Sequence, residues 1–125
     1  MFRRMYHWQV GKFFADPKVG EEFLPLLYQQ FVASPTTHEA FFGLNRDLRA
    51  TIAAGAASVP RLRRFGRPVR IIFGAADPYL NAGVARRFHQ LLPTSELFLL
   101  DGARHYVQLD EPQQVARLIL AIPER

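Results

Sequence analysis

Two short apolar runs in the second half of the chain constrain the fold more than any other feature of the sequence. PVRIIF at 68–73 and ELFLL at 96–100 are dominated by β-branched, aromatic and aliphatic residues. Runs with so little polar alternation are typical of strands buried on both faces of a parallel sheet. Each run is followed by a helical pattern, at 81–93 and 110–122. The order strand, helix, strand, helix predicts an α/β fold.

The first half of the chain, to about residue 60, has a different pattern that is typical of helices. Apolar residues recur there at helical spacing in three segments. The segments run from Phe2 to Phe14, over EEFLPLLYQQFVA at 21–33, and from Thr36 to Ile52. Two parallel strands need further cover to be stable. Because the three helices are strongly apolar, we expect them to cover another apolar surface.

Local start signals predict where the helices begin. Pro25 suits the first turn of the second helix. Thr36 is expected to cap the third helix, with Glu39 three residues later at the capping-box position. Asp110 is expected to be the N-cap of the last helix, with Gln113 at the equivalent box position.

Length and composition narrow the class of protein. A chain of 125 residues, 49% apolar and 22% charged, is long and apolar enough to form one domain with a core. The absence of cysteine excludes disulfides, zinc–cysteine sites and a cysteine nucleophile, and it fits a reducing compartment. The first residues lack the apolar run of a signal peptide, and no stretch approaches the length of a membrane span. We therefore expect a cytoplasmic protein without a membrane partner.

The net charge of +5 has a local source in the segment RLRRFGRPVR. Five arginines lie within ten residues there: Arg61, Arg63, Arg64, Arg67 and Arg70. They could form a phosphate-binding patch, or a solvated connector leading into the first strand. Because no aromatic stacking platform or groove-reading helix accompanies the cluster, we expect no nucleic-acid partner.

The candidate functional residues follow the two predicted strands. Asp77 lies in GAADPYLN after the first strand, and His105 lies in DGARHYVQLDEP after the second. Loops at the carboxyl ends of neighbouring parallel strands meet at one edge of a sheet. A carboxylate there can orient an imidazole and leave its other nitrogen as a general base. The plain alternatives are an Asp-Pro turn and a loop histidine that faces water.

Other polar and aromatic residues have less specific interpretations. Asp101 and Arg104 flank the histidine and are expected on the surface. The remaining histidines, His7, His38 and His89, are expected to be structural or solvent-facing. Several aromatic residues could line an apolar pocket or simply belong to the core: Trp8, Phe13, Phe14, Phe41 and Phe42.

The arrangement of strands and loops resembles the α/β-hydrolase family. The motifs are strand–G-x-x-D–helix at Gly74–Asp77 and strand–G-x-x-H–helix at Gly102–His105, and the resemblance covers about residues 66 to 122. It implies that Asp77 is the acid of a catalytic triad and His105 its histidine, in the chain order of that family, and it implies no cofactor. The helical first half resembles, by architecture, the cap of the epoxide-hydrolase, haloalkane-dehalogenase and carboxylesterase-like branches.

Two motifs of that family are missing from the sequence. No G-x-S-x-G or G-x-D-x-G nucleophile elbow and no HG oxyanion dipeptide occur. We therefore expect the C-terminal part of an α/β-hydrolase fold, with a helical cap-like segment at 1–60 and two parallel strand–helix units at 61–125. The complete enzyme would hydrolyse a small, mainly apolar ester, epoxide or halide, and this chain alone would be inactive. The alternative is a non-catalytic remnant that forms a homo-oligomer or associates with a complementing chain.

Overall fold

The computed structural model describes residues 2–123, with only the backbone of Phe2. The predictions that involve residue 1, residues 124–125 and the Phe2 side chain lie outside this range. The described elements are α1 (Phe2–Gly11), α2 (Pro17–Ala33), α3 (Pro35–Arg46), α4 (Leu48–Ala57), α5 (Val59–Leu62), β1 (Val69–Gly74), α6 (Ala82–Leu91), β2 (Ser95–Leu100), α7 (Val107–Asp110) and α8 (Pro112–Leu120).

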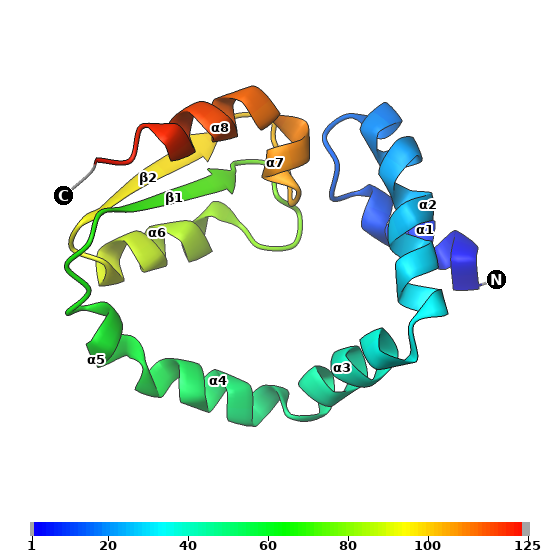
Figure 1. Ribbon diagram of the computed structural model, residues 1–125, viewed down its shortest axis with the longest axis horizontal. Helices are drawn as coiled ribbons and strands as arrows, with labels where there is room; N and C mark the ends of the chain where they lie inside the picture. The colour runs from blue at the N-terminus through cyan, green and yellow to red at the C-terminus, as the bar shows by residue number, and fades with distance from the viewer. Residues whose placement is uncertain (1, 124–125) are drawn as a thin grey trace.

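The two predicted strands form a parallel pair. Their register runs from Val69 beside Ser95 to Gly74 beside Leu100. Helix α6 packs against one face of this sheet and α8 lies over the other (Figure 1). The order strand, helix, strand, helix is confirmed, and the mixture of helices with a parallel sheet is compatible with an α/β fold.

The core of the strand-containing part lies between the sheet and the last helix. Leu100, Ala103 and Val115 form its buried cluster, and partly buried apolar side chains pack around them: Ile72, Phe98, Val107 and Leu118. The prediction of strands buried on both faces was wrong, because every strand residue before the final one stays partly or well exposed. Within residues 2–123, α6 covers one face of this narrow sheet, α8 and α7 contact the other, and no further strand pairs with either edge.

Helix α2 begins earlier than predicted. Asp16 is its N-cap, with a side-chain oxygen that accepts a hydrogen bond from the backbone N–H of Lys18 at 2.8 Å, and Pro17 occupies the first turn. Asp16 and Pro17 therefore act as the start signal, since proline's missing N–H costs nothing in a first turn. Pro25 consequently lies inside the helix, and its predicted place in the first turn was wrong.

The third predicted helix differs in its start and its continuity. Ser34, rather than Thr36, is the N-cap, and its hydroxyl oxygen accepts from the backbone N–H of Thr37 at 3.2 Å. The helix ends at Arg46, and a separate helix starts after Asp47. A serine followed by proline competes successfully with the threonine because Pro35 suits the first helical position.

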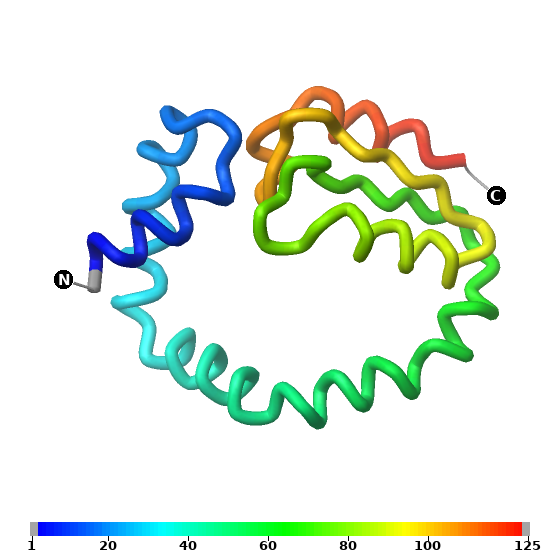
Figure 2. The backbone as a smooth tube through the Cα atoms, turned by 180° about the vertical axis from the view of Figure 1, so that it is seen from behind, coloured from blue at the N-terminus to red at the C-terminus, as the bar shows by residue number. Residues whose placement is uncertain are grey.

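The apolar helices α3 and α4 contact only neighbouring helices among residues 2–123, so the apolar surface that they were expected to cover is not found there. Together with α5 they form an arc that leads from the α1–α2 pair around to β1 (Figures 1 and 2). Their large apolar side chains are exposed: Phe41, Phe42, Leu44, Leu48 and Ile52. Helix α5 spans the predicted boundary at residue 60, and the division into two domains stays a prediction.

None of the helices within residues 2–123 combines the length and the apolar character needed to cross a membrane.

Candidate functional site

The loops after β1 and β2 cross at close range at the carboxyl edge of the sheet. The backbone N–H of Ala76 donates to the carbonyl oxygen of Ala103 at 3.0 Å. A β-carbon on Gly74 would lie 2.6 Å from that same oxygen and would overlap the carbonyl oxygen of Arg104. Gly102 has a φ of 77°, which favours glycine. The two glycines of the G-x-x-D and G-x-x-H motifs therefore serve close approach and a left-handed turn, respectively.

This crossing brings Asp77 and His105 together, as the sequence predicted. Nδ1 of His105 lies 2.9 Å from Oδ2 of Asp77. The other carboxylate oxygen accepts hydrogen bonds from the backbone N–H groups of Tyr79 at 2.8 Å and Leu80 at 3.0 Å. The Asp77 side chain is buried, whereas 28% of the His105 side chain is exposed. The carboxylate is thus held in a fixed orientation while part of the imidazole stays accessible.

The hydrogen bonds fix the charge of Asp77 and the tautomer of His105. Burial acts to raise the pKa of Asp77, but the hydrogen bonds from His105, Tyr79 and Leu80 outweigh it, and the pKa falls below its usual value. An ionised carboxylate can only accept, so Nδ1 carries the proton in this hydrogen bond. Nε2 has no hydrogen-bond partner among residues 2–123 and is not buried, which leaves it free to take a proton.

We expect the lowered pKa of Asp77 to make stability depend on pH. Its contribution is complete above the pKa of an unfolded aspartate, about 3.9, and is lost as pH falls through the lower folded value. The free energy of unfolding of the wild type should therefore fall as the solution is acidified below about pH 4. Asp77→Asn should flatten this decline, measured by urea unfolding at a series of pH values. Parallel curves for the two proteins would contradict the effect of these hydrogen bonds on the pKa of Asp77.

Aromatic rings surround the imidazole of His105. The centroids of the Phe13, Tyr106 and Tyr79 rings lie 4.8, 5.5 and 5.7 Å from that of the imidazole. Phe13 was expected on the first helix, but α1 ends at Gly11 and Phe13 lies in the loop that follows. The chain leaves the helix through a turn in which Phe13 N–H donates to the Val10 carbonyl oxygen. The turn directs this loop toward the histidine.

The other candidate aromatic residues separate into core and surface. Phe14 is 1% exposed and packs against the Tyr106 ring, with ring centroids 4.8 Å apart, so it belongs to the core. Trp8, Phe41 and Phe42 are largely exposed and line neither the core nor the histidine site. Phe13 is therefore the member of this set that the structure brings to the candidate site.

Asp110 does not cap the last helix, so that prediction was wrong. Helix α8 begins at Pro112 after Glu111, which makes no side-chain capping bond. The carboxylate of Asp110 instead accepts from the backbone N–H of Ala15 at 2.8 Å and from that of Arg104 at 2.7 Å. Both N–H groups lie in loops and have no partner within a helix, so the carboxylate supplies the acceptor that they need. No local signal in the sequence pointed to a partner 95 positions away.

Arg104 was expected on the surface, but it is partly buried and points toward the N-terminal segment. One guanidinium nitrogen lies 3.3 Å from the carbonyl oxygens of both Lys12 and Phe14. Asp101 is exposed, as predicted. The segment that carries His105 is therefore joined to the loop between α1 and α2 by Arg104, which precedes the histidine, and by Asp110, which follows it.

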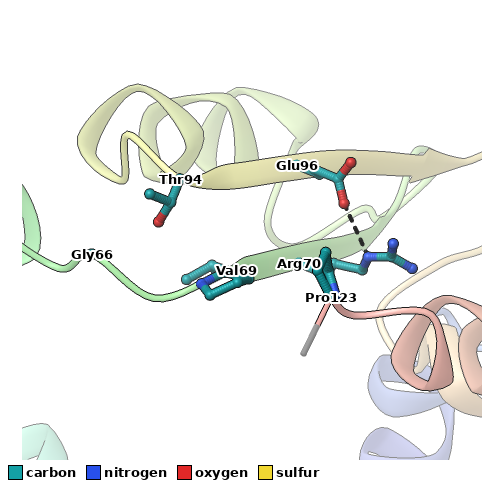
Figure 3. A pocket seen from close by; sticks show the side chains of 7 residues that line it. Gly66, Val69, Arg70, Thr94, Glu96 and Pro123 are labelled. Carbon is teal, nitrogen blue, oxygen red and sulfur yellow. Dashed lines mark hydrogen bonds and ion pairs between the residues drawn. The ribbon is translucent and has the colours of Figure 1, made fainter. Parts of the chain in front are cut away.

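A separate hollow lies at the opposite, amino-terminal end of the strands (Figure 3). Arg70 borders it, but its Nε pairs with Glu96 at 3.1 Å and another guanidinium nitrogen donates to the Leu118 carbonyl oxygen. Arg61, Arg63, Arg64 and Arg67 are exposed. Arg70 is thus engaged within the fold, and the remaining arginines match the solvated connector.

The remaining histidines have no part in the Asp77–His105 pair. Nδ1 of His89 lies 2.9 Å from the hydroxyl oxygen of Ser95, and His38 packs against the Phe31 ring. Nε2 of His7 is buried without a hydrogen-bond partner in the described chain. Across residues 2–123, no three His, Asp or Glu side chains gather in a group that could hold a metal ion.

The comparisons with known proteins return no relative of this chain. It matches no protein-family model, no curated protein and no solved structure.

Proposed function

We propose that Asp77 and His105 are the acid and the base of an α/β-hydrolase-type site, whose nucleophile lies outside these 125 residues. The observation that carries this proposal is the 2.9 Å hydrogen bond between Nδ1 of His105 and a buried Asp77 carboxylate, with Nε2 left unpaired. The resemblance of the G-x-x-D and G-x-x-H motifs supports it, because each glycine has a structural reason at the loop crossing.

In this proposal each residue has a distinct task. Nε2 of His105 removes the proton from a nucleophilic hydroxyl, or from the water that attacks a carboxylate-bound intermediate. The ionised Asp77 keeps the imidazole oriented and stabilises the imidazolium that forms. Phe13, Tyr79 and Tyr106 give the neighbourhood an aromatic character that suits a small, mainly apolar ester, epoxide or halide. The site needs no cofactor for this chemistry.

The proposal is tested by reading the DNA upstream of Met1 in frame and assaying the extended polypeptide. An open frame with HG followed by G-x-S-x-G predicts ester hydrolysis, and G-x-D-x-G predicts hydrolysis of epoxides or halides. Hydrolysis that depends on His105 would support the proposal. An extended polypeptide without an elbow, and no hydrolysis with any chain that co-purifies, would contradict it.

Self-association is the second candidate function, and exposed apolar surface favours it. Phe42 and Ile52 are 62% and 63% exposed on neighbouring helices, and the strands of the sheet have uncovered edges. Contiguous exposed apolar surface and unpaired strand edges both favour association with another copy of the chain. In this candidate function the Asp77–His105 pair is a remnant without a catalytic task.

We expect the isolated chain to form dimers or larger oligomers in dilute solution, measured by light scattering. Ile52→Glu should shift the population toward the monomer, because it places a charge on the apolar surface of α4. Ala53→Glu is the matched control, since it adds the same charge at the next exposed position. A monomeric wild type with a sharp, cooperative urea transition would contradict self-association and would indicate a self-sufficient fold.

A further inference from the structure

We propose that Asp110 is a positioning residue, which fastens the loop between α1 and α2 to the histidine loop and seats Phe13 against His105. Any effect of Asp110 on catalysis rests on the proposed function of His105. The fastening itself follows from the hydrogen bonds of Asp110, and it is measurable on the chain without any substrate.

The fastening depends on one carboxylate that accepts from two distant segments. Oδ1 of Asp110 accepts from the backbone N–H of Ala15, and Oδ2 accepts from that of Arg104, the residue before His105. Hydrogen bonds to a charged acceptor are stronger than those between neutral groups. One side chain thus ties the backbone next to the histidine to the backbone next to Phe14.

Further hydrogen bonds join the same two loops. The backbone N–H of Tyr106 donates to the carbonyl oxygen of Phe13 at 3.2 Å. The Arg104 guanidinium reaches the carbonyl oxygens of Lys12 and Phe14. The backbone on both sides of Phe13 is therefore bound to the residues on both sides of His105.

The consequence for the site is the position of the Phe13 ring. Its backbone is held by Tyr106, and its ring lies 4.8 Å from the imidazole and 5.6 Å from the Tyr79 ring, measured between centroids. A ring so close to the proposed base would contact the group next to the bond being cleaved. Phe13 would thereby favour substrates with a flat or branched apolar group at that position.

Hydrogen exchange on the full 125-residue chain tests the fastening, with Asp110→Ala compared against the neighbouring control Glu111→Ala. We expect Asp110→Ala to reduce the exchange protection of the Ala15 and Arg104 amides roughly 10- to 100-fold, the range for losing a hydrogen bond to a charged group. The Tyr106 amide should lose protection with them, although it donates to Phe13 and not to Asp110. The amides of β1 that face β2, such as that of Ile71, should keep their protection in both variants.

A spectroscopic signature separates positioning from general stability. Because the Phe13 ring lies 4.8 Å from the imidazole, its ring current is expected to shift the NMR signal of the His105 Cε1 proton. Phe13→Leu should therefore move that signal while it keeps an apolar side chain. Asp110→Ala should move the signal in the same direction, and Glu111→Ala should leave it in place. If Asp110→Ala also unfolds the strands, Asp110→Asn, which keeps one acceptor oxygen, should still reproduce the movement in part.

The outcomes distinguish this inference from the proposed function. Unchanged protection at Ala15 and Tyr106, or an unmoved imidazole signal in Asp110→Ala, would overturn the fastening role. Hydrolysis that survives the loss of His105 would overturn the proposed function and leave the fastening intact.

Discussion

Replacing His105 with alanine is expected to lower kcat for hydrolysis by at least about 1,000-fold in the polypeptide that carries the nucleophile. The reason is that Nε2 is the proposed proton acceptor, and members of a triad act as a unit. Steady-state rates with an ester, an epoxide and a haloalkane measure the effect. His89→Ala is the matched control, because His89 is an exposed residue of α6 that is engaged with Ser95.

Hydrolysis should also depend on Asp77, which acts by orienting His105. In Asp77→Asn the amide can present its N–H₂ to Nδ1, which favours the wrong tautomer of His105, and a loss of about 10,000-fold in kcat is expected. Asp101→Asn, at the exposed position directly after β2, should keep wild-type rates. Loss of activity in the controls, or its survival in both site variants, would contradict the assignment of acid and base.

Replacing Gly74 with alanine is expected to destabilise the fold by about 3 kcal/mol, measured by urea unfolding. The added β-carbon would lie 2.6 Å from the Ala103 carbonyl oxygen and closer still to that of Arg104. Both obstacles are backbone atoms, so neither can rotate away as a flexible side chain would. The two loops must separate, and the hydrogen bond between Asp77 and His105 should lengthen with them.

A matched control exists among the helical glycines. Gly43 lies in α3, and a β-carbon there would meet nothing within 4 Å. Gly43→Ala should therefore raise the free energy of unfolding by about 0.5–1 kcal/mol through helix propensity. Equal effects of the two substitutions would contradict the close loop crossing at Gly74.

The strand-containing half of the chain could be predicted well because its signals are local. The runs before Gly74 and Asp101 formed the two strands, and the pattern at 81–93 formed α6. Parallel pairing then placed both loops at one edge, so the meeting of Asp77 and His105 followed from strand direction alone. Their catalytic role stays a prediction.

The helical half was less predictable because several start signals competed within a few residues. Asp16 with Pro17 and Ser34 with Pro35 started helices that apolar periodicity placed later. Periodicity indicates which residues share a face, but it does not indicate what covers that face. The exposure of Phe42 on α3 could therefore not be derived from spacing.

The order of strands and helices, and the loops that carry Asp77 and His105, could be predicted from the amino-acid pattern, because they depend on short-range signals and on the geometry of parallel strands. The hydrogen-bond partners of Asp110 and the place of Phe13 depend on the packing of distant segments. Asp110 had a plausible local use as a helix cap, but its partner Ala15 lies 95 positions away. Phe13 reached the histidine because its loop is held by hydrogen bonds to residues 104 and 106. Contacts between segments so far apart leave no periodic or motif signal, since either segment alone is compatible with many partners.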